Sequence, residues 1–216
     1  MGAVLGAGIP IAIAGGAVLG AFVSSTVGAY DHFYPTQPGG NIITAIKLPD
    51  VSFGIDPGGY GRYGYLHNKY CLQVLAVGNA IKPTLGEFIV TYAQPVIDDL
   101  AMQTGLEKAT LLEILSNEDL LRSIQEVRAI ETMEEYKAYV SQHYSDPKLV
   151  YYNLELMSRI ENLTKSNQAV VRDYFTALLN IIATDPTLSP ETRELLLAEF
   201  NIGNYSAALW MANEPE

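Results

Sequence analysis

The sequence predicts a mainly α-helical protein in three parts. Residues 1–30 hold no charged side chain, and small residues recur there at every fourth position. From about residue 85 onward, apolar residues follow helical spacing and helix-start signals are frequent. Proline and glycine interrupt the stretch between. We therefore expect an N-terminal Gly/Ala-rich single helix over 1–30, an irregular Gly/Tyr/Pro-rich connector with short strands over 31–84, and a C-terminal all-α bundle over 85–216.

Small residues form a row along the expected N-terminal helix. The members of this first row are Gly8, Ala12, Gly16, Gly20, Ser24 and Gly28. A second row lies beside it and consists of Ala17, Ala21, Ser25 and Ala29. Helices in hydrocarbon gain nothing from hydrophobic association, so their packing depends on close approach of backbones, which small residues permit. The first row is therefore predicted to be a helix-packing surface.

The length of this segment fits a transmembrane helix. Residues 11–29 would span about 28 Å at roughly 1.5 Å per residue, close to the hydrocarbon thickness of about 30 Å. Pro10 stands at its start, where a helix tolerates proline. Two alternatives stay open, a helix buried inside a protein assembly and a secretory signal peptide. The signal-peptide alternative offers a small-residue cleavage site at 27–29 but no basic residue before the apolar core.

The connector is expected to be irregular because turn signals break it repeatedly. They occur at Pro35, at 38–40, at 49–50 and at 56–59. Short strands are expected at 41–48 and 51–55, whereas 71–77 fits either strand or helix. Its many tyrosines fit either a lipid–water interface or packing onto a neighbouring subunit, and we favour packing for the cluster around Tyr60.

Residues 59–64 (GYGRYG) match the dinucleotide-binding pattern G-x-G-x-x-G. That site needs a strand leading into the glycines and a helix opening from them, with its N-terminus aimed at the pyrophosphate. A turn signal precedes the motif, and residues 65–70 show no helix-start signature. The sequence therefore argues against nucleotide binding here.

The third part should form an acidic helical domain. Helices are expected at 85–102, 105–115, 118–130, 133–144, 147–163, 167–183, 190–200 and 204–212. Four sequence pairs favour N-caps, namely Thr104 with Glu107, Thr132 with Glu135, Asp146 with Pro147, and Ser189 with Pro190. Pro95 should kink or end the first of these helices.

Two of these helices should form the centre of the bundle, because their apolar residues share one face. The expected core positions are Leu149, Tyr152, Leu156, Ile160 and Leu163 on one helix. On the other they are Val170, Val171, Tyr174, Phe175, Leu178, Ile181 and Ile182.

The charge distribution argues against a nucleic-acid partner. The net charge is −11, and residues 1–97 contribute none of it, with four basic and four acidic side chains. Residues 98–216 carry nine basic and twenty acidic ones. Phosphate binding needs clustered Lys and Arg, and no such cluster occurs.

No catalytic constellation stands out in the sequence. The single cysteine, Cys71, is interpreted as a buried structural residue. His32, His67 and His143 are scattered without metal-ligand spacing. We therefore predict a protein that is not an enzyme, with no catalytic residue, no cofactor and no metal.

Residues 9–15 (IPIAIAG), within the Gly/Ala-rich opening, resemble the start of the internal virion (ejection) proteins of short-tailed phages. The resemblance covers about twenty residues and carries no functional residue across. It implies a protein stored in a particle and released to help a channel cross an envelope. We accordingly expect a structural assembly protein in a virion or membrane, one copy in a homo-oligomer with other subunits. The alternative is a membrane-anchored accessory subunit of a cellular multiprotein complex.

Overall fold

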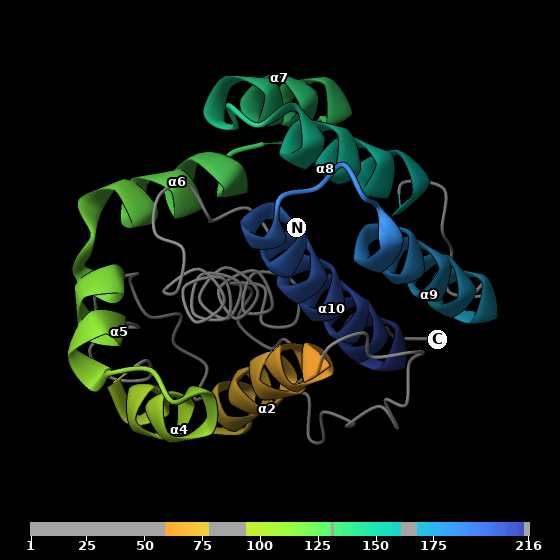
Figure 1. Cartoon of the computed structure of the whole chain (residues 1–216). Helices are drawn as coiled ribbons and strands as arrows, with labels where there is room; N and C mark the ends of the chain where they lie inside the picture. Colours follow the sequence, from red (N-terminus) through yellow and green to blue (C-terminus); the bar gives the residue numbers. More distant parts are fainter. Residues whose placement is uncertain (1–58, 78–93, 131, 161–167, 214–216) are drawn as a thin grey trace, which may run out of the picture.

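The computed structural model describes residues 59–77, 94–130, 132–160 and 168–213, and this part of the chain is helical (Figure 1). It contains eight helices and no strand, which confirms the mainly α fold. The helices are α2 (Gly61–Val77), α4 (Gln94–Thr104), α5 (Lys108–Ser116), α6 (Glu118–Arg128), α7 (Met133–His143), α8 (Pro147–Ile160), α9 (Gln168–Thr184) and α10 (Pro190–Asn213). The N-terminal helix and the strands expected at 41–48 and 51–55 lie outside the described residues.

The hydrophobic core lies among α7, α8, α9 and α10. Phe175 and Leu179 of α9 and Leu196 of α10 have no more than 1% of their surface exposed. Burial of side chains of this size contributes roughly 1.5–3 kcal/mol each. The packing of these four helices therefore contributes substantially to stability in the described part of the chain.

The core face predicted for α9 is partly wrong. Val171, Phe175, Leu178 and Ile182 are buried as expected, and Tyr174 is partly buried, but Val170 and Ile181 are 54% and 55% exposed. Leu179, which the prediction omitted, is completely buried. The buried stripe is thus rotated toward α10, because α10 is the helix against which α9 packs most extensively. On α8, Leu149 and Tyr152 are buried as predicted.

α10 is one helix where two were expected. We predicted a break between residues 200 and 204, because Asn201, Gly203 and Asn204 have low helix propensity. The helix continues through them without interruption. Asn201 and Asn204 are 2% and 1% exposed, so tertiary packing on this segment outweighs the local preference.

Three of the four predicted N-caps are confirmed. The Thr132 backbone N–H donates to Glu135 Oε2 (3.0 Å) and the Glu135 N–H donates to Thr132 Oγ1 (3.2 Å), which is a capping box. Asp146 accepts from the Lys148 N–H (2.8 Å), and Ser189 from the Thr192 N–H (3.0 Å). These bonds satisfy amides that a helix start leaves free.

The capping box predicted at Thr104 and Glu107 is wrong. Thr104 is the last residue of α4, and Glu107 itself is the N-cap of α5, without a side-chain cap bond. The chain reverses between these helices at Gly105, whose φ of +72° suits glycine. Pro95 lies in the first turn of α4, where its missing N–H costs nothing. The rest of the helix expected before it lies outside the described residues.

α2 corrects the expectation of an irregular connector over 31–84. Residues 71–77 take the helical one of their two alternatives, and residues 61–70, where no helix was expected, are helical as well. The chain turns at Gly59, which has a φ of +80°, and then forms helix through Val77. We missed it because the segment has no acidic residue in its first turn, and because two of its first four residues are glycines, which favour turns. Its stability comes instead from packing.

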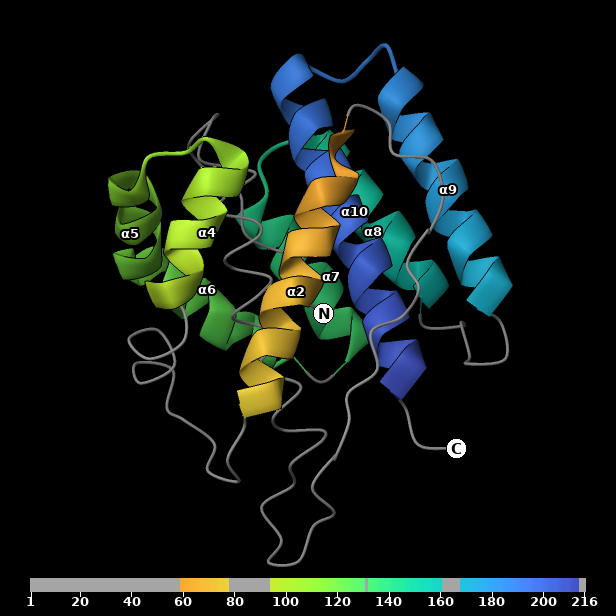
Figure 2. The same ribbon diagram turned by 90° about the horizontal axis from the view of Figure 1, so that it is seen from below.

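α2 packs most extensively against α10, and Figures 1 and 2 show the two helices side by side. Gly64 lies against Asn201 and Tyr205, and Asn68 Nδ2 donates to the backbone oxygen of Tyr205 (2.7 Å). Residue numbers rise together along this contact, so the helices run parallel. The boundary expected near residue 84 therefore has an extensive contact across it, although the division into domains stays a prediction.

The glycine at position 64 permits the close contact between α2 and α10. A Cβ there would lie 2.7 Å from the Asn201 carbonyl oxygen and would overlap the Tyr205 ring. No larger residue fits without moving a helix. The last glycine of the GYGRYG motif thus serves helix packing within the chain, and Tyr63 and Tyr70 of the same helix are buried.

Candidate functional site

The small-residue row predicted to pack helices lies outside the described residues. Its members are Gly8, Ala12, Gly16, Gly20, Ser24 and Gly28. The row therefore stays a prediction. The candidate site in the described part of the chain is a different one, a group of buried polar side chains around Glu199.

Glu199 lies on the core-facing side of α10 and is 1% exposed. Neither of its carboxylate oxygens accepts a hydrogen bond. The side chains around it are Tyr136 of α7, Tyr144 just beyond α7, and Asn153 of α8, all no more than 7% exposed. We name these four residues the Glu199 cluster. Carboxyl groups are almost never buried without a partner, so this cluster is the most unusual chemical feature of the described residues.

Burial raises the pKa of Glu199 to about 8, because a charged carboxylate is poorly solvated in an apolar core. The Asn153 amide, the second cause, acts in the opposite direction. One N–H of its Nδ2 donates to the backbone oxygen of Leu149 (3.0 Å), and burial remains the larger cause. At pH 7 Glu199 is therefore mainly protonated.

The two phenols of the cluster also stay neutral. Burial, with the nearby Glu199 as the second cause, raises the pKa values of both Tyr136 and Tyr144. The Tyr144 hydroxyl has no hydrogen-bond partner. The cluster thus places three groups that carry protons in one apolar volume, without a cation to balance a negative charge.

A second group of buried polar side chains, His67, Asn68 and Cys71, lies within about one turn of α2. The His67 Nε2 lies 3.6 Å from the Cys71 Sγ, and the His67 Nδ1 lies 2.9 Å from the Asn68 Oδ1. When the Nδ1 N–H donates to the Asn68 oxygen, the imidazole Nε2 can accept the proton of the Cys71 thiol. All three side chains are between 0% and 2% exposed, so no reactant reaches the thiol in this conformation. The interpretation of Cys71 as a buried residue is confirmed.

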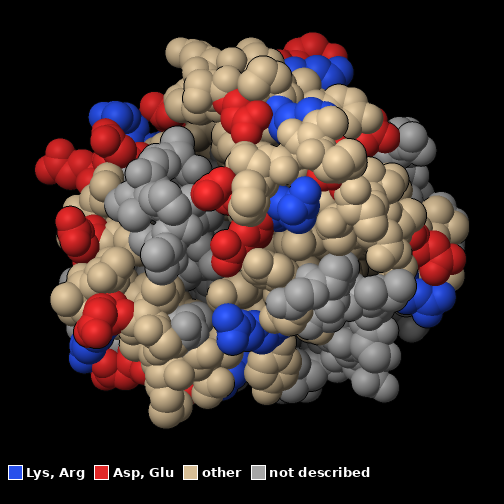
Figure 3. Space-filling model, in the orientation of Figure 1, with Lys and Arg blue, Asp and Glu red and all other residues tan. Residues whose placement is uncertain are grey.

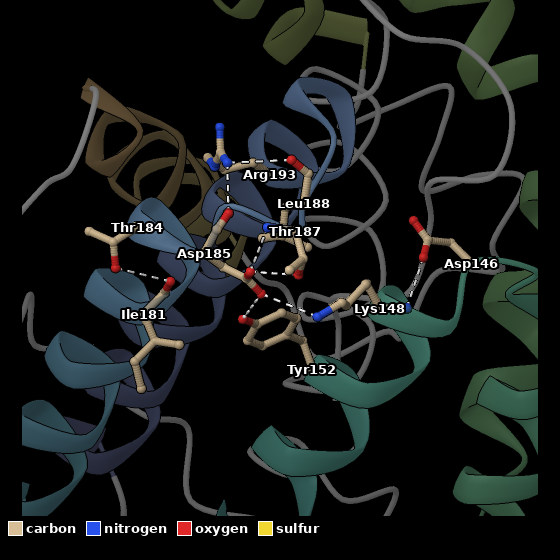
Figure 4. A network of polar contacts seen from close by, with 9 residues as sticks. All are labelled: Asp146, Lys148, Tyr152, Ile181, Thr184, Asp185, Thr187, Leu188 and Arg193. Atoms are coloured by element: carbon tan, nitrogen blue, oxygen red, sulfur yellow. Dashed lines mark hydrogen bonds and ion pairs between the residues drawn. The ribbon is translucent and has the colours of Figure 1, made fainter.

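Asp185 organises a polar network at the loop between α9 and α10 (Figure 4). Its carboxylate accepts from the Thr187 hydroxyl (2.6 Å) and backbone N–H (2.8 Å), from the Tyr152 hydroxyl (2.9 Å), and from Lys148 Nζ (3.4 Å). Its backbone oxygen accepts from Arg193 Nη2 (2.7 Å). The bonds from Thr187, followed by those from Tyr152 and Lys148, lower the pKa of Asp185. The network ties the loop to α8 and α10 and leaves no group disposed for catalysis.

A smaller network joins α2 to α4. Asp99 accepts from Lys69 Nζ (2.7 Å) and from the Tyr70 hydroxyl (2.8 Å). The bond from Lys69 is the largest cause that lowers the pKa of Asp99. The pKa of Tyr70 is raised, first by burial and second by its hydrogen bond to Asp99. The contact fixes the position of α4 on α2.

The remaining sequence expectations concern metals and membranes. No group of three His, Cys, Asp or Glu side chains in the described ranges could hold a metal ion. Within the same ranges, no helix combines the length and apolarity of a membrane crossing.

Comparisons with known proteins give no relative. No protein family, no curated protein and no solved structure matches this chain.

Sequence reasoning missed the Glu199 cluster, although one signal was available. Residues 195–200 (LLLAEF) are apolar except for the glutamate. An acidic side chain inside such a run must either face solvent alone or enter the core. Because residues 195–200 are all buried, the structure shows that it enters the core.

Proposed function

We propose that this chain is a non-enzymatic assembly protein, one of several copies in a virion, with a membrane-active N-terminal helix. The observation that carries the proposal is the uncharged segment 1–30, with its row of small residues, joined to a strongly acidic helical part. Such a chain has one segment suited to lipid or to a helix bundle and another suited to water.

The surface of the described helices supports the proposal that the acidic part of the chain lies in water. Figure 3 shows acidic side chains spread over one face, with basic ones dispersed among them. Several exposed apolar side chains are also available for contacts between subunits, among them Tyr151 of α8 and Val170 and Ile181 of α9. The strong polar networks, by contrast, join helices within the chain.

The proposal is tested with the purified full chain and phosphatidylcholine–phosphatidylglycerol vesicles. We expect the chain to float with the vesicles and to give discrete cross-linked oligomers. Gly16→Leu and Gly20→Leu should keep vesicle binding and lose the oligomers, because leucine blocks close backbone approach. Ala14→Leu is the matched control, since residue 14 lies outside both rows, and it should keep both properties.

Two outcomes would contradict the proposal. Failure of the wild-type chain to bind vesicles would show that the N-terminal helix is not membrane-active. Unchanged oligomers in both row variants would show that the row of small residues is not a helix-packing surface. A cellular accessory subunit is the competing function, and purification of the chain as one copy beside unrelated subunits would favour it.

A further inference from the structure

The Glu199 cluster contains more buried polar groups than its hydrogen bonds satisfy. Both oxygens of Glu199 and the hydroxyl of Tyr144 lack partners. These groups come from α10 and from the end of α7, and Asn153 of α8 borders them. The cluster therefore lies where three helices of the main core meet.

We propose that Glu199 makes the packing of α10 against α7 and α8 depend on a proton: the three helices pack when the carboxyl is protonated and open when it ionises. A neutral carboxyl in this position leaves unsatisfied hydrogen-bonding groups, which is a moderate cost. A carboxylate in the same position is an uncompensated buried charge, which costs far more.

Among the described residues, no cation is one of the groups that shift the pKa of Glu199, and only the Asn153 amide favours its ionised form. From α7 and the residue that follows it, Glu199 faces the phenols of Tyr136 and Tyr144, whose negative forms would repel it. From α8 it faces the neutral amide of Asn153, and no ionisable group of α2, α9 or α10 is among those that shift its pKa. Beyond that one amide, the described residues offer the ionised form no stabilisation, so it gains most from water, which reaches it if the helices separate.

The direction of the pH effect follows from the two states. The pKa of Glu199 is about 8 in the fold and about 4.5 for an ordinary, solvated carboxyl. Between these values the packed state binds one proton more than the open state, so raising the pH favours opening. The opening equilibrium constant should rise tenfold per pH unit.

Hydrogen exchange of the full chain tests this directly. After correction for the intrinsic pH dependence, the opening constant of amides in α7, α8 and α10 should rise about a hundredfold from pH 5.5 to pH 7.5. In Glu199→Gln, which cannot ionise, it should stay constant. Glu191→Gln changes an exposed glutamate of the same helix and should keep the wild-type slope.

A second control concerns His143, the histidine of α7. It lies on α7, stacked on Tyr139, and pairs with Glu126 (3.4 Å) rather than with Glu199. His143→Gln should therefore keep the slope. Loss of the slope in this variant, or its persistence in Glu199→Gln, would overturn the proposal.

A measurement on the wild-type chain covers the case in which Glu199→Gln does not fold. With 13C-labelled glutamate carboxyls, the resonance of Glu199 should titrate near pH 8. If every glutamate titrates below about pH 6, the proposal is wrong.

Discussion

Asp185 shows what a single side chain contributes at the junction of three helices. It accepts hydrogen bonds from the loop after α9 and from α8, while its backbone oxygen accepts from α10. Three of the four groups that donate to its carboxylate are neutral. The fourth, Lys148 Nζ, is 3.4 Å away and 41% exposed. The bonds therefore act mainly by fixing geometry, and all of them favour the ionised carboxylate.

We expect Asp185→Asn to lower the melting temperature at pH 7, because asparagine cannot accept from all four donors. The pKa of Asp185 is depressed in the fold, so its contribution is present above the unfolded value of about 3.8 and is lost as the pH falls below it. The difference between variant and wild type should therefore shrink in acid. Thermal melts at pH 3 and pH 7 measure it.

The control for this prediction is Asp173→Asn, which changes an exposed aspartate of α9 that pairs with Arg172. It should have little effect at either pH, since exposed ion pairs contribute little. An Asp185→Asn variant that melts like the wild type at pH 7 would show that the network is incidental.

At the scale of elements, the contact between α2 and α10 is set by one residue. Gly64 lies where a Cβ would meet the α10 backbone, whereas Gly203 of α10 lies where a Cβ would meet the Phe175 ring at 3.5 Å, an ordinary contact distance. The same substitution should therefore have opposite effects at the two glycines.

Gly64→Ala should destabilise the protein by about 1–3 kcal/mol, as overpacking does. Gly203→Ala should stabilise it by roughly 0.5–1 kcal/mol, because alanine is the better helix former. Urea unfolding of both variants provides the measurement. A Gly64→Ala variant as stable as the wild type would mean that α2 does not lie as close to α10 as the structure shows.

Local signals allowed most helices to be predicted, but tertiary packing determines the rest. The caps at Thr132, Asp146 and Ser189 are visible in the sequence because a cap depends on neighbours a few residues away. The helix of α2 and the continuity of α10 are not visible, because each depends on the other helix. The Glu199 cluster depends on three helices at once, and for that reason the sequence showed an acidic residue in an apolar run but not its surroundings.

At the scale of the whole molecule, α2 belongs with the helices that follow it. The sequence suggests that residues 98–216 fold alone, since their caps and core faces are locally complete. That fragment lacks α2 and so leaves the α2-facing side of α10 uncovered. We expect fragment 59–216 to unfold at a clearly higher urea concentration than fragment 98–216, with a larger dependence of the free energy of unfolding on urea.

Equal urea midpoints for the two fragments would contradict this expectation and would favour a domain boundary near residue 84. Gly64→Ala within fragment 59–216 is the informative control. It should move the midpoint toward that of the shorter fragment, because it weakens the same contact.

The parallel arrangement of α2 and α10 has a mechanical consequence. Gly61 and Asn213, the first residue of α2 and the last of α10, lie at opposite ends of the pair. Tension applied between the two ends of the chain therefore pulls the helices along their axes in opposite directions. Every contact between them, from Gly64 to the Asn68–Tyr205 hydrogen bond, bears load at once instead of being peeled apart in sequence. A pull on the N-terminal segment thus meets its greatest resistance as soon as it reaches the first turn of α2.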